Sequence, residues 1–334
     1  MTLASCDEPL IAGHDAVLLD LDGVVYRGGD AIAGAVEALS AVDGVPVAYL
    51  TNNANRSPAA VVDHLRRLGL AVEDDDVVTS AQAIARVIAA DLPAGSVVFT
   101  VGGDGLRAAL EDRGLTPTGD RRTPEVTAVV QGYSPDLGWR DLAEAAYAVE
   151  AGLPWYASNT DLTIPTADGI APGNGSLVHA VRLATGQEPV VAGKPYAPLF
   201  EETMARIDSR RPLMVGDRLD TDILGARRAG IASLLVLTGV NSLADALAAN
   251  PDERPDFVGD DLAALHRPQR AVEIDADGLR ARCDGVEVEL RDDVVVQHGS
   301  GGDRTALQRA ALALGWARRD DTGAAVVLDE RIDP

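Results

Sequence analysis

Two carboxylates one residue apart, Asp20 and Asp22, follow the short apolar run 16–19 and precede Gly23. A short apolar run that ends at turn residues is typical of a buried strand. Ligands of open parallel sheets bind beyond the carboxyl ends of the strands, and a glycine lets the backbone come close to a ligand. The stretch therefore predicts a site that begins at Asp20. The alternative is that both carboxylates are solvated residues of an ordinary turn.

Three further predicted strands also end in polar residues, and each is followed by a loop and a helix. In chain order the four strand ends carry Asp20 and Asp22, then Thr51 and Asn52, then Lys194, and then Asp217 and Asp222. If the strands share one parallel sheet, all four ends open at the same edge. Clustered carboxylates repel each other unless a cation lies among them, and oxygen ligands without His or Cys favour Mg²⁺. Lysine, threonine and backbone N–H groups at that edge would hold a phosphoryl group.

The elements that must position these residues alternate between strand and helix. This alternation predicts an α/β fold, with a doubly wound parallel-sheet core covered by helices on both faces. We expect a first part of the core at residues 1–80, an inserted α/β domain at 81–186, a second part of the core at 187–266 and a small α+β segment at 267–334.

Local signals mark several helix starts. Ser57 followed by Pro58 is typical of a helix N-terminus, and Asp104 is expected to cap the helix 104–113. The stretch 158–175 is expected to be a long polar loop, and loops of that length are usually functional. His179 is interpreted as an exposed helix residue.

Composition excludes several classes of partner. The chain has 334 residues, a formal net charge of −23 and a pI of about 4.5, which argue against binding to nucleic acids or anionic membranes. Its two cysteines, Cys6 and Cys283, form neither a disulfide framework nor a metal-binding spacing. We see no signal peptide and no apolar run long enough to span a membrane, so a cytoplasmic location is expected.

The four strand ends resemble the motifs of the haloacid dehalogenase (HAD) superfamily of phosphatases. The resemblance covers roughly residues 14–262 and is carried by four segments, namely 20–26 (DLDGVVY), 50–53 (LTNN), 193–195 (GKP) and 216–222 (GDRLDTD). Their order and spacing are similar to class IIA, the subgroup with a large α/β cap (type C2) between the second and third motifs. That subgroup holds p-nitrophenylphosphatase-like, phosphoglycolate and glycerol 3-phosphate phosphatases.

The resemblance implies a role for each matching residue. Asp20 would be the nucleophile that forms an aspartyl-phosphate, and Asp22 would be the general acid and then the general base. Mg²⁺ would be held by the Asp20 carboxylate, the Asp22 backbone carbonyl and Asp217, with Asp222 orienting the waters of the metal. The residues implied to bind the phosphoryl group or substrate are Thr51, Asn52, Asn53 and Lys194.

The inserted cap is expected to select the substrate. Candidate specificity residues are Asn159 and Asp161 in the cap loop, together with Asn53 and Arg56. For Asn159 and Asp161, a role as turn formers is an equal alternative.

The C-terminal segment departs from the family pattern. Its strands, the loop 299–302 (GSGG) and the helix after it faintly resemble the coenzyme-binding half of a GNAT-type acetyltransferase. A glycine-rich loop that opens a helix is weak support for such a site. We interpret the segment as a packing or regulatory appendage, and expect its deletion after about residue 265 to leave phosphate release largely unchanged.

The expected function is hydrolysis of a small phosphorylated metabolite, with glycerol 3-phosphate or phosphoglycolate favoured. Sugar phosphates, nucleotides and pyridoxal phosphate are alternatives. A phospho-accepting signalling domain is an alternative of a different class, although it would need neither Asp22 nor a cap. A homodimer is possible through the cap or through the C-terminal segment.

Overall fold

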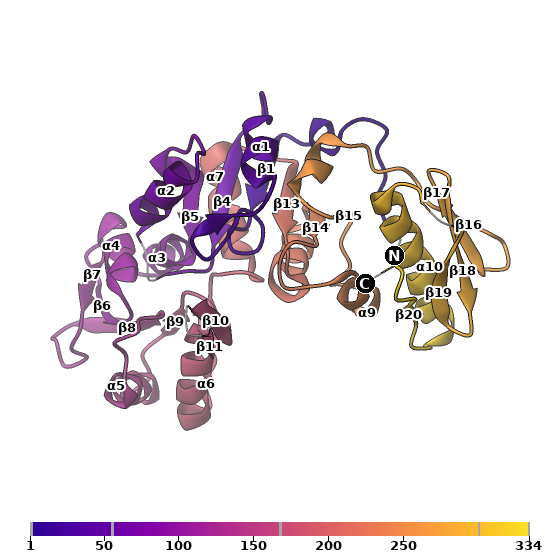
Figure 1. Ribbon diagram of the computed structural model, residues 1–334. Coiled ribbons are helices and arrows are strands. Elements are labelled where there is room, and N and C mark those ends of the chain that lie inside the picture. Colours follow the sequence, from indigo (N-terminus) through magenta and orange to yellow (C-terminus); the bar gives the residue numbers. More distant parts are fainter. Residues whose placement is uncertain (1–2, 55–56, 167–168, 300, 333–334) are drawn as a thin grey trace. The chain divides into compact units, whose positions relative to one another are not determined.

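The computed structural model describes residues 3–54, 57–166, 169–299 and 301–332. It divides into two compact units, residues 1–47 with 209–334, and residues 48–208 (Figure 1). Arg56 and Ser300, which were named above, lie outside the described residues. No helix among the described residues is both long enough and apolar enough to span a membrane.

The first unit contains parallel strands that are buried on both faces, as their apolar sequences predict. In spatial order they are β15 (Phe257–Gly259), β14 (Ala232–Val236), β13 (Pro212–Gly216) and β1 (Ala16–Leu19). The helices of this region are α1 (Ala35–Ser40), α8 (Leu224–Ala229) and α9 (Leu243–Ala248), and a short hairpin pairs β2 (Tyr26–Arg27) with β3 (Asp30–Ala31). The predicted doubly wound architecture is confirmed.

The register of β1 and β13 determines which polar residues meet. Leu19 pairs with Val215 in parallel, and the Asp20 N–H donates to the Val215 carbonyl at 3.0 Å. Because both strands run in the same direction, Asp20 and Asp217 leave the sheet at the same edge.

The C-terminal segment forms a second sheet in this unit. Its strands are β16 (Glu273–Ile274), β17 (Arg280–Cys283), β18 (Val286–Arg291), β19 (Val294–His298) and β20 (Val327–Leu328), antiparallel except for the last pair. Helix α10 (Arg304–Thr322) lies along this sheet (Figure 1). The sheet and the helix confirm the predicted α+β character of this segment.

A shared apolar core joins this segment to the parallel sheet. Buried side chains of α9 and β15 pack in one cluster with those of β18, β19 and α10. The indole N–H of Trp316 donates to the Ala246 carbonyl at 3.0 Å. The Arg254 guanidinium makes two 2.7 Å hydrogen bonds to the Asp320 carboxylate and lies 5.2 Å from the Trp316 ring centre. The segment is thus part of the folding unit of the parallel sheet.

The second unit contains strands β4 (Val47–Thr51) and β5 (Val77–Thr79) and a parallel sheet ordered β12-β9-β8-β6-β7. The strands of the latter are β12 (Val190–Val191), β9 (Trp155–Ala157), β8 (Val126–Gln131), β6 (Val97–Val101) and β7 (Thr116–Thr118). The helices are α2 (Pro58–Arg67), α3 (Ser80–Asp91), α4 (Asp104–Asp112), α5 (Trp139–Glu150), α6 (Asn174–Thr185) and α7 (Ala197–Ile207).

Local predictions in this unit had mixed outcomes. Ser57 caps α2 as predicted, because its side chain accepts the Ala60 N–H. The prediction for Asp104 was wrong, since Gly103 is the N-cap of α4 and Asp104 is the first helical residue. A carboxylate in the first turn still favours the helix through the helix dipole. His179 is exposed on α6, as expected.

The stretch 158–175 is more ordered than a loop. It contains a two-stranded hairpin of β10 (Thr163–Thr166) and β11 (Gly169–Pro172). The two strands contain prolines at 165 and 172, and proline has no N–H for a sheet. In a two-stranded hairpin both strands are edges, so proline is tolerated there.

Candidate functional site

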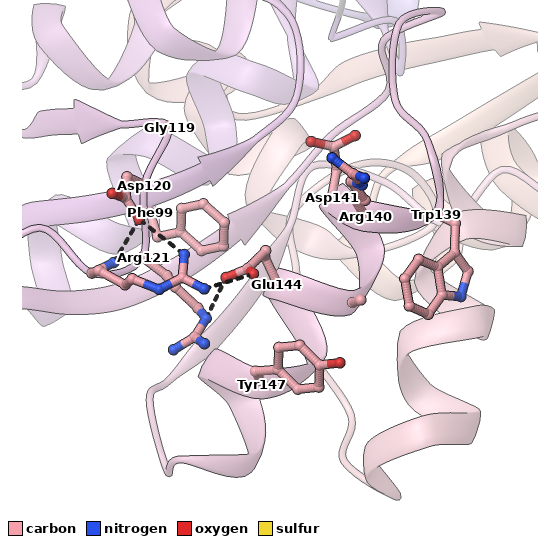
Figure 2. Close-up of a pocket in the computed structure, with 11 residues that line it drawn as sticks. Phe99, Gly119, Asp120, Arg121, Trp139, Arg140, Asp141, Glu144 and Tyr147 are labelled. Atoms are coloured by element: carbon pink, nitrogen blue, oxygen red, sulfur yellow. Dashed lines mark hydrogen bonds and ion pairs between the residues drawn. The ribbon is translucent and has the colours of Figure 1, made fainter.

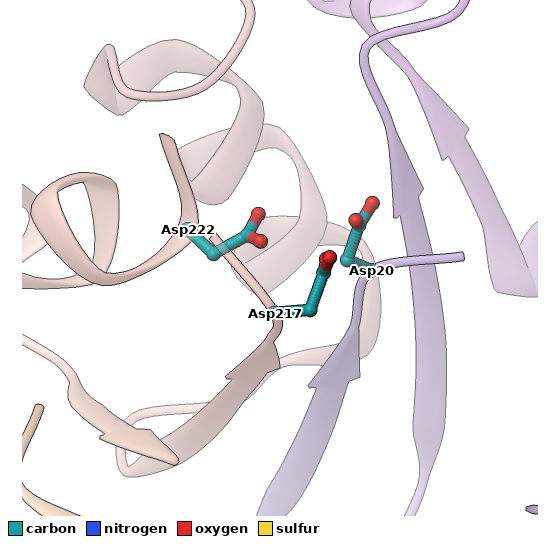
Figure 3. Close-up of side chains that lie close together, drawn as sticks. All are labelled: Asp20, Asp217 and Asp222. Carbon is teal, nitrogen blue, oxygen red and sulfur yellow. The ribbon is translucent and has the colours of Figure 1, made fainter. Parts of the chain in front are cut away.

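Three carboxylates gather at the edge of the parallel sheet in the first unit. Asp20, Asp217 and Asp222 each offer an oxygen, and these oxygens lie within 4.8 Å of one another (Figure 3). The residues are 9 %, 0 % and 0 % exposed. Asp20 follows β1, Asp217 follows β13, and Asp222 belongs to the π-helical turn Leu219–Ile223 that comes next. The sequence prediction that these three side chains lie close together is therefore supported by the geometry.

The loop after β14 encloses the Asp217 carboxylate. The Val240 N–H donates to Asp217 Oδ2 at 2.6 Å, and the Asn241 N–H donates to the Asp217 carbonyl at 3.2 Å. Gly23 and Gly239 lie very close to this carboxylate. A Cβ on Gly23 would lie 2.4 Å from Asp217 Oδ2, and a Cβ on Gly239 would lie 1.8 Å from it. The glycines are thus required by the close approach of the backbone.

The turn that carries Asp222 is held from two sides. The Arg218 N–H donates to Asp222 Oδ2 at 3.1 Å, which folds the turn back on itself. The Leu219 N–H donates to Asn241 Oδ1 at 2.9 Å, which ties the turn to the loop after β14. The sequence analysis did not single out Asn241, although its side chain lies in the loop that follows β14, another strand of the same sheet.

The donor set of this cluster fits a hard divalent cation. Three buried carboxylates in such proximity repel one another, and a cation among them removes that cost. Carboxylate oxygens without nitrogen or sulfur donors are the ligands that Mg²⁺ prefers. The exposed side chain of Asp22 is not part of the cluster. This agrees with the resemblance, which assigned only the backbone carbonyl of Asp22 to the metal.

A second polar cluster lies in the other unit and centres on Asn52. Its Oδ1 accepts the Lys194 N–H at 2.8 Å, and its Nδ2 donates to the Lys194 carbonyl at 3.0 Å and to Asp161 Oδ1 at 2.9 Å. The Asn52 carbonyl accepts from Asn159 Nδ2 and from Ser80 Oγ, both at 2.7 Å. The structure thus brings together Asn52, Asn159, Asp161 and the backbone of Lys194.

Asn159 uses its side chain to stabilise the conformation of its own loop. It is 4 % exposed, its Nδ2 donates to the Asn52 carbonyl and to Ser158 Oγ, and its Oδ1 accepts the Asp161 N–H at 3.2 Å. Asp161 is half-buried and carries a charge, so it is the more suitable of the two cap residues for recognising a ligand.

Thr51 and Asn53 lie on either side of Asn52. Thr51 is 5 % exposed and its Oγ1 accepts the Asn53 N–H at 3.1 Å, whereas the Asn53 side chain is exposed. The bond uses a lone pair of the threonine hydroxyl and not its hydrogen.

Lys194 is the only lysine in the sequence; the other 28 of the 29 basic Lys and Arg residues are arginines. It is 3 % exposed, and buried lysines are rare in proteins. The ammonium is a compact charge with three donors, whereas guanidinium is a planar fork. Lysine at this one position, in a chain whose other Lys and Arg residues are all arginines, marks Lys194 as a candidate site residue. The presence of a single lysine can be seen in the sequence, but the sequence analysis did not use it.

A pocket of about 540 Å³ lies over α5 in the second unit and contains none of the predicted site residues (Figure 2). Trp139 and Tyr147 on its wall are 77 % and 48 % exposed. Arg121 and Arg122 form ion pairs with Glu144, and Arg121 lies 5.4 Å from the Tyr147 ring centre. These contacts account for Arg121 and Arg122 without a bound ligand.

Comparison with known families supports the motif assignment. Residues 17–116 match the family model of haloacid dehalogenase-like hydrolases, and residues 191–265 match a second model described as HAD-hydrolase-like. The D-glycerol 3-phosphate phosphatase of Mycobacterium tuberculosis is 49 % identical over 261 residues, which are 78 % of this chain and 73 % of that protein. An acid sugar phosphatase of Staphylococcus epidermidis is 35 % identical, over 70 % of this chain and 90 % of that protein.

Solved structures give the same answer. The glycerol phosphate phosphatase of Mycobacterium tuberculosis in complex with magnesium superposes with a TM-score of 0.85 at 42 % identity, covering 96 % of this chain and 94 % of that one. The 4-nitrophenylphosphatase of Thermotoga maritima reaches a TM-score of 0.71 at 29 % identity, covering 77 % and 98 %. The chain therefore belongs to the haloacid dehalogenase-like hydrolases and is a phosphatase of that family.

Proposed function

We propose that this phosphatase hydrolyses glycerol 3-phosphate through a phosphorylated Asp20. The observation that carries the proposal is the buried cluster of Asp20, Asp217 and Asp222, whose oxygens lie within 4.8 Å of one another. Such a cluster joins a nucleophile to a cation site at one sheet edge. The phosphatases of this family use Mg²⁺, and the donor set fits that ion.

The proposed reaction has two steps. An Asp20 oxygen attacks phosphorus and the bond to the leaving oxygen breaks, while Asp22 donates a proton to that oxygen. Asp22 then takes a proton from a water molecule, whose oxygen attacks phosphorus and breaks the bond to Asp20. The greater exposure of Asp22 suits a group that must exchange protons with both the leaving group and water.

The negative charge of the phosphoryl oxygens must be balanced by the protein and the metal. Asp20, Asp217 and the Asp22 carbonyl would hold Mg²⁺, which supplies positive charge to the phosphoryl oxygens, and Asp222 would orient its waters. We propose that Thr51, Asn53 and Lys194 bind phosphoryl oxygens. The single buried ammonium of the chain supports this role for Lys194.

The choice of substrate rests on relatives and on one cap residue. A relative named for glycerol 3-phosphate is 49 % identical to this chain, whereas an acid sugar phosphatase is 35 % identical. We assign Asp161 to the recognition of a substrate hydroxyl, since a half-buried carboxylate is a strong acceptor for O–H donors. Phosphoglycolate carries a carboxylate instead and would be repelled by Asp161. Sugar phosphates, nucleotides and pyridoxal phosphate remain alternatives.

We also propose a cytoplasmic homodimer formed by the α5 face. The exposed rings of Trp139 and Tyr147 lie there among three arginines and three acidic residues, namely Arg121, Arg122, Arg140, Asp120, Asp141 and Glu144. Two copies of a chain of net charge −23 repel each other. At a face where positive and negative charges balance, this repulsion is weaker, so two copies can approach there. We assign no role to nucleic acids or membranes, and the division into segments 1–80, 81–186, 187–266 and 267–334 stays a prediction.

Phosphate release from a panel of small phosphomonoesters tests the proposal. We expect Mg²⁺-dependent release, abolished by chelator and by Asp20→Asn, with glycerol 3-phosphate the best substrate. Asp104→Asn, a change at an exposed helix residue, is the matched control and should retain activity. Preference for another ester would overturn the substrate assignment. An acid-labile phosphate on the protein without turnover would favour the signalling class.

A further inference from the structure

We propose that Asn52 is a positioning residue that fixes the backbone of Lys194 and couples it to the cap loop at Asp161. This inference rests on the proposed function, because it explains how the lysine assigned to the phosphoryl group is held. It gives Asn52 a different task from the direct phosphoryl contact that the motif resemblance implied.

The side-chain amide of Asn52 pairs with both backbone groups of Lys194. Its oxygen accepts the Lys194 N–H at 2.8 Å and its nitrogen donates to the Lys194 carbonyl at 3.0 Å. An amide side chain can make this double contact because its donor and acceptor lie side by side. The pairing fixes both the position and the orientation of the lysine backbone. Asn52 itself is 9 % exposed, which keeps water from competing for these bonds.

The amide has no hydrogen left for a phosphoryl oxygen. Asn52 Nδ2 carries two hydrogens, and one is donated to the Lys194 carbonyl and the other to Asp161 Oδ1 at 2.9 Å. A phosphoryl oxygen needs a donor, and Oδ1 is an acceptor. A direct contact by this side chain would therefore break a bond that it already makes.

The same residue anchors the cap loop. The Asn52 carbonyl accepts Asn159 Nδ2 at 2.7 Å, and Asn159 Oδ1 accepts the Asp161 N–H at 3.2 Å. Together with the bond from Asn52 Nδ2 to Asp161, these contacts close a ring through Asn52, Asn159 and Asp161. Two loops far apart in the sequence, 158–161 and 193–194, are thus attached to one side chain.

Gly193 makes this close approach possible. A Cβ on Gly193 would lie 2.7 Å from Asn52 Oδ1, 2.7 Å from the Ser158 carbonyl and 2.8 Å from Asn159 Cβ. Any side chain there would push the three segments apart. The glycine of the GKP motif is accordingly explained by the packing of the Lys194 loop on Asn52 and the cap loop.

Positioning of the lysine backbone matters because the side chain is long and flexible. An ammonium on four methylenes reaches one place reliably only if its backbone is fixed. A displacement of about 1 Å from the reacting group can cost on the order of 100-fold in rate. We expect Asn52→Leu to lower kcat/KM by about 10- to 100-fold, and Asn52→Asp to have a similar effect because a carboxylate cannot donate and repels Asp161.

The single lysine offers a direct readout that does not depend on turnover. Chain grown with ¹⁵N-lysine should give one backbone lysine resonance, that of Lys194. In the parent protein this N–H is bonded to Asn52 Oδ1, so it should exchange slowly with solvent. In Asn52→Leu the resonance should shift and exchange at least about tenfold faster. Asn250→Leu, at an exposed asparagine bonded to Glu253, should leave the resonance unchanged.

Each outcome has a defined meaning. An unchanged Lys194 resonance in folded Asn52 variants with reduced activity would overturn the proposal and favour a direct substrate contact. A changed resonance in a protein that releases no phosphate from any ester would sustain the positioning role while removing the proposed function. If Asn52→Leu does not fold, Asn52→Asp keeps the shape of the residue. Asp161→Asn retains an acceptor for Asn52 and should therefore leave the lysine resonance in place.

Discussion

Gly239 lies against the carboxylate of Asp217 so closely that a β-carbon would be 1.8 Å from Oδ2. The two residues come from neighbouring parallel strands, since Asp217 follows β13 and Gly239 lies in the loop after β14. The next residue of that loop, Val240, donates its N–H to the same oxygen at 2.6 Å. The loop therefore determines where the carboxylate can lie, and only a glycine fits beside it.

Gly239→Ala should therefore impair the cation site. The added methyl must displace Asp217 from the cluster, and we expect Mg²⁺ affinity to fall by about 10- to 100-fold, with activity following. Calorimetric titration with Mg²⁺ measures the affinity. Gly13→Ala, at a glycine with nothing within 4 Å of the added carbon, is the control and should bind as the parent does. Parent-like affinity in Gly239→Ala would mean that Asp217 is not a ligand.

The sequence was sufficient to predict the acidic cluster, and the reason is geometric. Parallel strands bring their carboxyl ends to one edge, so Asp20 and Asp217 could be placed together from strand order alone. The same reasoning did not reach Gly239, because its contribution is a close approach of the backbone and carries no recognisable side-chain chemistry. A glycine that is needed for close approach cannot be distinguished by sequence from one in an open turn.

The amide cluster was predicted only in part. The motifs identified Asn52 and Lys194 individually, but not that one side chain would pair with the other's backbone. Such pairing depends on loops that converge from positions more than a hundred residues apart, and no local pattern records it. The hairpin within 158–175 escaped prediction for the opposite reason. Its prolines carry a strong local signal against strands, and tertiary context overrode that signal.

A pH dependence of stability should arise from His14. Burial lowers the pKa of its imidazole, and the ring packs edge-on against Phe257 at 6.3 Å. Its other neighbours are the carbonyl and charge of Arg211 and the carboxylates of Asp15 and Asp256. Since the folded pKa lies below the unfolded one, the unfolded chain takes up the proton first. The contribution of neutral His14 to the free energy of unfolding is therefore present above about pH 6.5. It is lost as the pH falls through the pKa of His14 in the folded protein.

The measurement is the midpoint of thermal unfolding between about pH 7.5 and about pH 5.5. We expect the midpoint to fall across this range, and to fall less in His14→Gln. His179→Gln, at an exposed histidine of α6, should behave as the parent does. An equal fall in all three proteins would show that other groups produce the pH dependence.

Trp139→Ala tests the proposed dimer. Removing an indole that is 77 % exposed costs the monomer little, but removes a large apolar contact from an interface. We expect the parent to have the mass of two chains by light scattering, and Trp139→Ala to dissociate at least about tenfold more readily. Leu183→Ala, at a residue of α6 that is 73 % exposed and outside the pocket, is the control. A parent protein with the mass of one chain would remove the dimer.

The C-terminal segment should be indispensable for folding, contrary to the expectation from its sequence. Deletion after residue 265 removes the partners of Leu243, Leu247 and Val258, which belong to the core shared with α10 and are at most 2 % exposed. Each such side chain contributes about 1.5–3 kcal/mol by burial, and a domain is stable by only about 5–15 kcal/mol. We expect the truncated chain to aggregate, as solubility and circular dichroism would reveal.

A single substitution tests whether the contact between this segment and the parallel-sheet region stabilises the protein. Arg254 is 2 % exposed, and its guanidinium is bound in two places by Asp320, a side chain 42 % exposed on α10. Asp320→Asn leaves the buried cation without its countercharge and should lower the free energy of unfolding by about 1–3 kcal/mol, less than for a fully buried pair. Asp321→Asn, at the exposed neighbour, should change it by less than about 0.5 kcal/mol. Denaturant unfolding measures both. The contrary result would be a soluble, active truncation together with an Asp320→Asn variant of unchanged free energy of unfolding. It would show that the parallel sheet folds without the segment and that the shared core does not stabilise it.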